Sequence, residues 1–353
     1  MSLPRGLVVA AAYSWRFLLV VGAATVLVYG LVKLRLLVFP IIIALMLATI
    51  VAPLAGWLTK RGIPRGLASF TVIIGGLLAL IGLVVLVAPL VAGEVDELGS
   101  SFKEGADRML RFLAEGPFEL SEQDIDRYLD QAGEQISQSR GQIASGVVAG
   151  AIKLIEVIAG ILLTIVLLFF FVRDGDRMYG WIESQFRNKN RLHARELGLR
   201  SWAVLRAYVR GIAIIALFDG AVMGITLLVI GAPLVVPLAL LTFFGAFFPI
   251  VGAVVAGAIA ALVTLVTSGL TDALVVTAVT IVINQLEGDI LQPLVMGKSL
   301  NLHPVAILVA LTAGGILAGV PGAFFSVPVA AVAATIGNYL KSAGTNEPMS
   351  APG

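Results

Sequence analysis

Continuous apolar runs, each followed by a polar stretch, dominate the first two thirds of the chain. They predict membrane spans at about residues 15–34, 36–58, 67–92, 151–172 and 208–231. Each run is close to the roughly 20 residues that a helix needs to cross a bilayer. The apolar residues do not alternate with a period of two, so the pattern excludes a transmembrane β-barrel.

Two longer apolar blocks fill most of the last third. They cover residues 237–268 and 304–340, which are 32 and 37 residues long. Each block is too long for one straight span and too short for two full spans with a turn. Glycines and prolines interrupt both blocks, so we expect broken helices or re-entrant hairpins that form a transport core. The helix-breaking positions are Pro249, Gly252, Gly314, Gly315, Pro321 and Gly322.

Two polar segments between the spans differ in charge. Residues 94–150 contain twelve Asp or Glu and five Lys or Arg, whereas residues 173–210 contain four acidic and nine basic residues. Apolar residues recur at helical spacing in both segments. Because basic segments remain in the cytoplasm, we expect extracytoplasmic amphipathic helices over 94–150 and a cytoplasmic amphipathic helix over 173–207.

The predicted fold class is an all-α polytopic membrane protein with about eight transmembrane helices. Both termini are expected in the cytoplasm. The predicted layout is three N-terminal spans (1–93), the acidic insertion (94–150), a fourth span (151–172), the basic helix (173–207), the transport core (208–340) and a disordered tail (341–353).

Composition agrees with a membrane protein and narrows the function. Hydrophobic residues make up 59% of the chain and charged residues 13%, and the mean hydropathy is +1.00. There is no cysteine, which excludes disulfides and thiolate metal sites. Nucleotide-binding, zinc-protease and serine-hydrolase motifs are absent, so we predict no enzyme activity, no cofactor and no metal. Topology explains the basic loops better than nucleic-acid binding does.

Acidic residues outnumber basic ones in the core. From residue 211 to residue 340 the charged residues are Asp219, Asp272, Glu287, Asp289 and Lys298. Four acids and one base cannot all be neutralised by pairing, so some acids must be protonated, meet water or meet a cation. Asp219 lies near the middle of an apolar span, where it is a candidate proton acceptor and donor. The alternative is a carboxylic acid that only hydrogen-bonds a neighbouring helix.

A polar cluster between the two long apolar blocks is the second candidate. Its members are Asn284, Gln285, Glu287, Asp289 and Gln292. An unwound turn near the intervening glycine would bring both carboxylates around one site, as in the discontinuous helices of transporters. The amides suit a small polyhydroxylated solute, or they hydrogen-bond between helices. The alternative for the acids is a solvated interfacial loop.

Several motifs together resemble the autoinducer-2 exporter family of bacterial membrane proteins. They are Val172-Arg-Asp-Gly-Asp176, Ala207-Tyr-Val-Arg-Gly211, Phe247-Phe-Pro-Ile-Val-Gly252, Gln285-Leu-Glu-Gly-Asp-Ile-Leu-Gln-Pro293, Leu302-His-Pro304, Gly314-Gly315 and Gly319-Val-Pro-Gly322. The resemblance implies eight spans, export of small molecules such as autoinducer-2, cation/proton antiport in some members, and a homo-oligomer such as a pentamer. The family often has Gln where this chain has Ile212.

The sequence therefore predicts a secondary transporter of the bacterial inner membrane. It would export a small polar solute, such as an autoinducer-2-like signalling molecule, with proton or sodium movement through the intramembrane acids. A cation/proton antiporter on the same scaffold is the first alternative. An uncoupled oligomeric channel or scaffold is the second. The expected partners are the lipid bilayer, the solute, a proton or sodium ion, and further copies of the chain.

Overall fold

The computed structural model describes residues 5–89, 154–248, 251–296 and 302–344. Within these ranges all the regular secondary structure is helical, and seven helices are long and apolar enough to cross a membrane. The protein is therefore an all-α polytopic membrane protein, as predicted. The acidic insertion over 94–150 and most of the tail over 341–353 lie outside the described residues.

Four helices form the N-terminal part of the described chain, and the last three pack together around small residues. They are α1 (Arg5–Lys33), α2 (Arg35–Lys60) and the helices Arg65–Pro89 and Leu154–Ser184. Ala44 and Ala48 of α2 are buried against Ile73 and Leu168 of the two following helices. Alanines allow helix backbones to approach closely in a membrane, where packing rather than hydrophobicity holds helices together.

Helix α5 (Asn188–Val229) is the longest straight element that the structure describes. Its 42 residues span about 63 Å, twice the roughly 30 Å of bilayer hydrocarbon. The sequence predicts one helix over 173–207 and a span from 208. The structure instead divides that range between the end of Leu154–Ser184 and the first half of α5. These two parts lie side by side as a polar arm, in which the Tyr179 hydroxyl donates to the Ala194 and Arg195 carbonyls at 3.1 and 2.6 Å.

The first long apolar block forms a hairpin of two short helices, α6 (Val235–Gly245) and α7 (Val251–Thr267). At 11 and 17 residues they extend about 16 and 26 Å, so neither spans the hydrocarbon layer. The arms touch near the tip. A methyl group on Gly245 would lie 2.9 Å from the Gly252 carbonyl oxygen, so the close approach requires glycine. Pro249 lies outside the described residues.

The second block, within α10 (Pro304–Gly344), also folds back on itself. The backbone leaves helical geometry at Ala318 and Gly319, where φ is +65° at the glycine. Gly314 and Gly322 then meet backbone to backbone across the turn. The predicted break in this block is confirmed, and its form is a hairpin. Gly315 and Pro321 flank the tip without making that contact.

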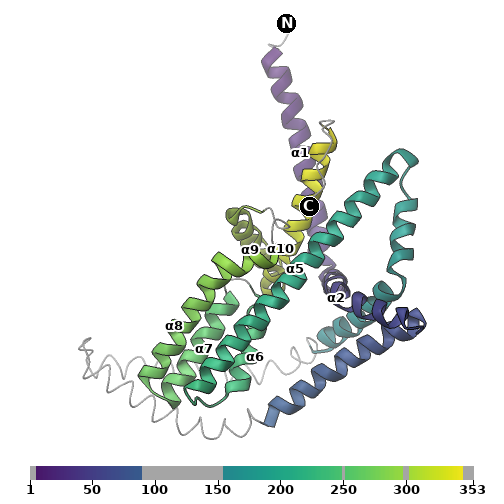
Figure 1. Cartoon of the computed structure of the whole chain (residues 1–353). Coiled ribbons are helices and arrows are strands. Elements are labelled where there is room, and N and C mark those ends of the chain that lie inside the picture. The colour runs from purple at the N-terminus through teal and green to yellow at the C-terminus, as the bar shows by residue number, and fades with distance from the viewer. Residues whose placement is uncertain (1–4, 90–153, 249–250, 297–301, 345–353) are drawn as a thin grey trace.

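The two hairpins approach from opposite ends of α5 and meet at their tips (Figure 1). The Phe248 and Phe324 rings lie 5.0 Å apart between centroids. Phe325 packs on Phe324 at 4.7 Å and joins a buried cluster with Tyr208 and Ile212 of α5. Ile212 is thus part of an apolar core.

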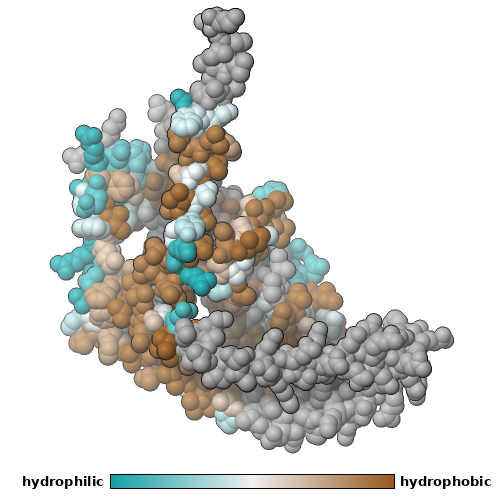
Figure 2. All heavy atoms as spheres, turned by 180° about the vertical axis from the view of Figure 1, so that it is seen from behind, coloured by the Kyte–Doolittle hydropathy of each residue, from teal (hydrophilic) through white to brown (hydrophobic). Residues whose placement is uncertain are grey.

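Apolar side chains also cover much of the outer surface (Figure 2). In that view hydrophilic residues gather at the end that carries the polar arm, and hydrophobic residues cover the body. Leu217, Ile225 and Leu228 of α5 are all more than 60% exposed. A soluble chain rarely exposes so large an apolar area, whereas a bilayer requires one. The body is therefore the membrane part of the chain.

Candidate functional site

Asp219 is the buried acid of the described core. It lies on α5 and is only 2% exposed. Ten residues separate it from the end of α5 at Val229, which corresponds to about 15 Å, or half the hydrocarbon thickness. Helix α5 thus buries a carboxyl group within its apolar half, where polar groups are expensive and usually functional.

The Asp219 carboxyl group is incompletely paired. Its Oδ1 atom is buried and has no hydrogen-bond partner. A buried acceptor without a donor costs about 1–3 kcal/mol, and more if it is charged. Such a group in a native structure calls for a proton, a water molecule or an ion next to it.

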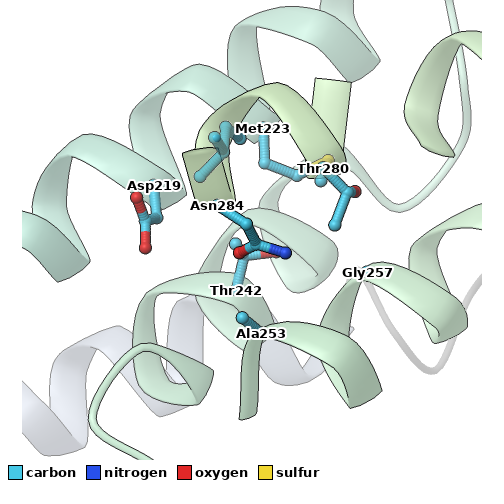
Figure 3. Close-up of a pocket in the computed structure, with 8 residues that line it drawn as sticks. Asp219, Met223, Thr242, Ala253, Gly257, Thr280 and Asn284 are labelled. Atoms are coloured by element: carbon cyan, nitrogen blue, oxygen red, sulfur yellow. The ribbon is translucent and has the colours of Figure 1, made fainter. Parts of the chain in front are cut away.

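A small cavity adjoins Asp219 where α5, α6, α7 and α8 (Leu270–Leu286) converge (Figure 3). In the close-up, Asp219 lies on one side and Thr280 on the other, with Asn284 and Thr242 between them. The cavity measures about 10 Å³, which is room for about one water molecule. Its lining residues are Asp219, Met223, Thr242, Ala253, Gly257, Thr280, Ile283 and Asn284.

The two threonines present acceptor atoms at this cavity. The Thr242 hydroxyl donates to the Leu238 carbonyl at 2.9 Å, and the Thr280 hydroxyl donates to the Val276 carbonyl at 2.8 Å. Each hydroxyl has one hydrogen, so neither is available to Asp219. Asn284 carries both an amide oxygen and an amide NH2 group. The cavity is therefore rich in oxygen lone pairs and poor in donors.

Small residues let the helices close around the site. A methyl group on Gly220 would lie 2.9 Å from Phe243 Cβ and 3.0 Å from the Ala239 carbonyl oxygen, which shows how closely α5 and α6 pack. Gly257 of α7 faces the methyl group of Thr280 of α8, and a methyl group added at Gly257 would overlap that Thr280 Cγ2 atom. These glycines let the helices pack closely beside the polar side chains.

The predicted polar cluster is only partly brought together with Asp219. Asn284 lines the cavity with it. Glu287 is half-buried, accepts a hydrogen bond from the Gln292 side chain at 3.2 Å, and lies within electrostatic reach of Asp219. Gln285, Asp289 and Gln292 are exposed on the surface of the single chain.

The two carboxylates of the cluster do not share one site. The chain at Glu287 is not unwound but forms a π-helical turn, η1 (Glu287–Leu291), that continues into α9 (Gln292–Met296). Residues two apart on a helix point in different directions, so Glu287 turns inward while Asp289 remains exposed. Wide helical turns of this kind occur frequently at functional sites.

Sequence reasoning missed Thr242, Thr280 and Gly257. Both threonines stand in apolar helices, where a hydroxyl that bonds its own backbone carries no charge signal. Their position opposite Asp219 depends on the α6–α7 hairpin. The one sequence signal is that each is a polar residue at bilayer depth. In the part of the chain that the structure describes, no group of three or more His, Cys, Asp or Glu could hold a metal ion.

Comparison with known proteins agrees with this architecture. The profile described as AI-2E family transporter matches residues 17–341. The chain is 36% identical over 321 residues to "Putative transport protein MT0215" of Mycobacterium tuberculosis (strain CDC 1551 / Oshkosh), covering 91% of this chain and 88% of that protein. It is 28% identical to "Putative transport protein YrrI" of Bacillus subtilis (strain 168), covering 85% of each.

A more distant relative extends over the same part of the chain. "Putative transport protein YhhT" of Escherichia coli (strain K12) is 23% identical, covering 89% of this chain and 88% of its own length. The profile match includes α5, both hairpins and the cavity. The chain belongs to the AI-2E family of transporters.

Proposed function

We propose that the chain is a secondary exporter of a small polar solute, such as an autoinducer-2-like signalling molecule, across the bacterial inner membrane. The observation that carries this proposal is Asp219, a buried carboxyl group with an unpartnered oxygen at a small cavity between α5 and a re-entrant hairpin. Exchange of a proton or sodium ion there would couple an ion gradient to movement of the solute. We further propose that both termini are cytoplasmic and that the transporter is a homo-oligomer, such as a pentamer.

Re-entrant hairpins support alternating access. The arms of the first hairpin are too short to span the hydrocarbon layer, so its tip would lie inside the layer, where irregular backbone is tolerated only if protein or a water-filled cavity covers it. The tips meet near the middle of α5 and close the cavity from the arm side, since Ile212 of the tip cluster precedes Asp219 on α5 by about 10 Å. Separation of the tips would open the cavity toward the arm.

One observation favours a second candidate, a cation/proton antiporter on the same scaffold. The cavity has room for about one water molecule, which fits an ion and excludes a solute in this conformation. The two candidates share the Asp219 site. They differ in whether a larger solute enters when the tips separate.

Transport in proteoliposomes tests the proposal. The purified chain is reconstituted with an imposed pH or sodium gradient, and uptake of labelled autoinducer-2 and of sodium into inverted vesicles is followed. We expect saturable, gradient-driven flux in the unmodified chain and a loss of about 100-fold in Asp219→Asn, because a neutral amide cannot exchange an ion. Glu287→Gln is expected to weaken flux less. Asp272→Asn, at the start of α8 and away from the cavity, is the matched control.

Three results would separate the alternatives. Gradient-driven flux that survives in both Asp219→Asn and Glu287→Gln rules out coupling through these acids. Ion flux without solute flux favours the antiporter. Solute flux that does not saturate favours the uncoupled channel.

A further inference from the structure

A basic turn joins two membrane helices in the N-terminal part of the chain. Helix α2 ends at Lys60, and the next helix begins at Arg65. Their 26 and 25 residues extend about 39 and 38 Å, which exceeds the roughly 30 Å of bilayer hydrocarbon. The turn between them therefore lies at the level of the lipid headgroups.

The helix Leu154–Ser184 passes beside this turn (Figure 1). A methyl group on Gly66 would lie 3.8 Å from Arg173 Cδ, and Asp176 pairs with Arg65 at 3.4 Å. Segments that are more than 100 residues apart in the sequence thus form one surface patch, which we call the basic collar. Its basic residues are Lys60, Arg61, Arg65, Arg173 and Arg177.

The positive charges of the basic collar exceed its negative charges. Only two acidic residues lie within 59–66 and 173–177, and both are already paired. Asp174 pairs with Arg173 at 3.1 Å, and Asp176 with Arg65. Within the part of the chain that the structure describes, no acid forms an ion pair with the other three basic residues. The collar therefore keeps a surplus of three positive charges.

Aromatic rings hold two of the arginines at the edge of the apolar surface. The Arg61 guanidinium lies over the Trp57 ring at 3.7 Å, and that of Arg173 lies 5.5 Å from the centre of the Phe169 ring. Tryptophan is enriched at the headgroup level, where long basic side chains also place their charges. The neighbouring apolar side chains, each more than 50% exposed, are Leu54, Leu67 and Phe70. A ligand here would meet positive charge and apolar side chains together.

We propose that the basic collar binds an anionic phospholipid, with Lys60, Arg61 and Arg177 at its phosphate and the apolar side chains near Trp57 along its acyl chains. Clusters of about four to eight Lys or Arg next to a membrane helix are typical of sites for anionic lipids. Free phosphate would satisfy the charges but leave the exposed apolar side chains without a partner. The inference goes beyond the proposed function, because it involves neither the solute nor Asp219. Since Arg177 lies at the base of the polar arm, the lipid ties that base to the bilayer.

Lipid binding to the purified full chain tests this site. The chain in a neutral detergent is titrated with phosphatidylglycerol or with phosphatidylcholine of the same acyl chains, and native mass spectrometry counts the bound lipid. Thermal unfolding in each lipid is the second readout. We expect phosphatidylglycerol to bind about tenfold more tightly or better, and to raise the unfolding temperature more, since a ligand that binds only the folded state stabilises it.

Two double variants that lose equal charge locate the site. Lys60→Gln with Arg61→Gln should weaken phosphatidylglycerol binding about 25-fold, because each basic residue near an anionic lipid contributes about a factor of five. Arg177→Gln alone should weaken binding about fivefold. Arg187→Gln with Arg195→Gln is the matched control, since both arginines are exposed on the polar arm and neither belongs to the collar. Binding in this control should be unchanged.

Three results would overturn the proposal. Equal binding of the two lipids would leave the collar to an acidic segment of another protein. Equal losses in the two double variants would indicate an effect of net charge without a site. Inorganic phosphate that binds as tightly as phosphatidylglycerol would indicate a site for free phosphate. None of these results bears on solute export, which is measured separately in proteoliposomes.

Discussion

The α6–α7 hairpin and the α10 hairpin use the same backbone contact but differ in what they carry. In both, a pair of glycines brings the two arms together near the tip, Gly245 with Gly252 and Gly314 with Gly322. The first hairpin supplies Thr242, Ala253 and Gly257 to the cavity, whereas no lining residue comes from α10. The comparison teaches that glycine contacts set the shape of both hairpins. The side chains along the arms then decide whether a hairpin also lines the cavity, as α6–α7 does, or does not, as α10.

The two hairpins are also held differently. The first packs along the second half of α5, where Met223 and Leu227 are buried against Leu234 and Leu238. The second packs on α5 and α2 through a cluster that includes Phe325 and Val327, contacts His193 through Tyr339 near its C-terminal end, and has few other buried residues. An element with few buried contacts opens at lower cost. We therefore expect α10 to be the hairpin that moves.

The tip glycines should give the largest effects, and equal ones in both hairpins. A methyl group in Gly252→Ala or Gly322→Ala would overlap the facing glycine carbonyl, so each should lose about 3 kcal/mol of unfolding free energy. Thermal unfolding in detergent measures the loss. The control is Gly315→Ala, where the nearest atom, Ala323 Cβ, would be 3.9 Å away. Unequal losses in the two hairpins would contradict their common construction.

Cross-linking the two tips should separate their roles in transport. The chain has no cysteine, so Phe248→Cys with Phe324→Cys creates a unique pair. We expect a short thiol cross-linker to reduce flux more than tenfold, with recovery on cleavage of the linker, because the tips could no longer part. Phe243→Cys with Phe247→Cys, whose rings lie 5.6 Å apart within the first hairpin, is the control pair. Full flux through linked tips would show that they do not gate the cavity.

Gly257→Ala should affect the cavity without unfolding the hairpin. The added methyl group would overlap the Thr280 methyl group, which must shift although the short β-branched side chain has few alternative positions. We expect gradient-driven flux to fall about tenfold and the unfolding free energy to fall by about 1–3 kcal/mol. Gly160→Ala, with nothing within 4 Å, is the control. Unchanged flux would indicate that the position of Thr280 does not matter.

The smallest expected effect concerns the anchor of the second hairpin. His193 Nδ1 and the Tyr339 hydroxyl lie 2.8 Å apart, and the Arg200 guanidinium lies over the Tyr339 ring at 5.2 Å. Tyr339→Phe removes the hydrogen bond and keeps the ring, so it should cost about 1 kcal/mol or less. A double-mutant cycle with His193→Ala measures the coupling. A coupling of zero would show that this contact does not hold α10.

Much of the fold could be predicted from the sequence because bilayer thickness fixes helix length. Apolar runs of about 20 residues predicted the N-terminal spans. The break at Gly319 was predicted because the second apolar block is too long for one span and contains glycines and a proline. The boundary at 207–208 could not be predicted, because α5 passes from polar to apolar surroundings without a helix stop signal. Helix continuity there depends on packing of the arm.

The site was predictable only where charge marked it. Asp219 was identifiable because an acid in an apolar span is costly. Thr242 and Thr280 were not, since their hydroxyls bond their own helices and their meeting with Asp219 requires the hairpin geometry. Asp289 illustrates the opposite error. Asp289 was included in the predicted polar cluster because it is acidic, but in the π-helical turn its side chain is exposed.

The unbroken length of α5 has a mechanical consequence. A single continuous helix joins the polar arm, which extends beyond the body, to the buried acid. From the start of α5 at Asn188 to Asp219 the distance is about 46 Å, at about 1.5 Å per residue. A tilt of about 10° around Asp219 would displace the water-exposed tip by about 8 Å. A protein, lipid or antibody that binds the arm could therefore tilt the whole helix and so displace the surroundings of Asp219 mechanically. No chemical signal would have to cross the bilayer.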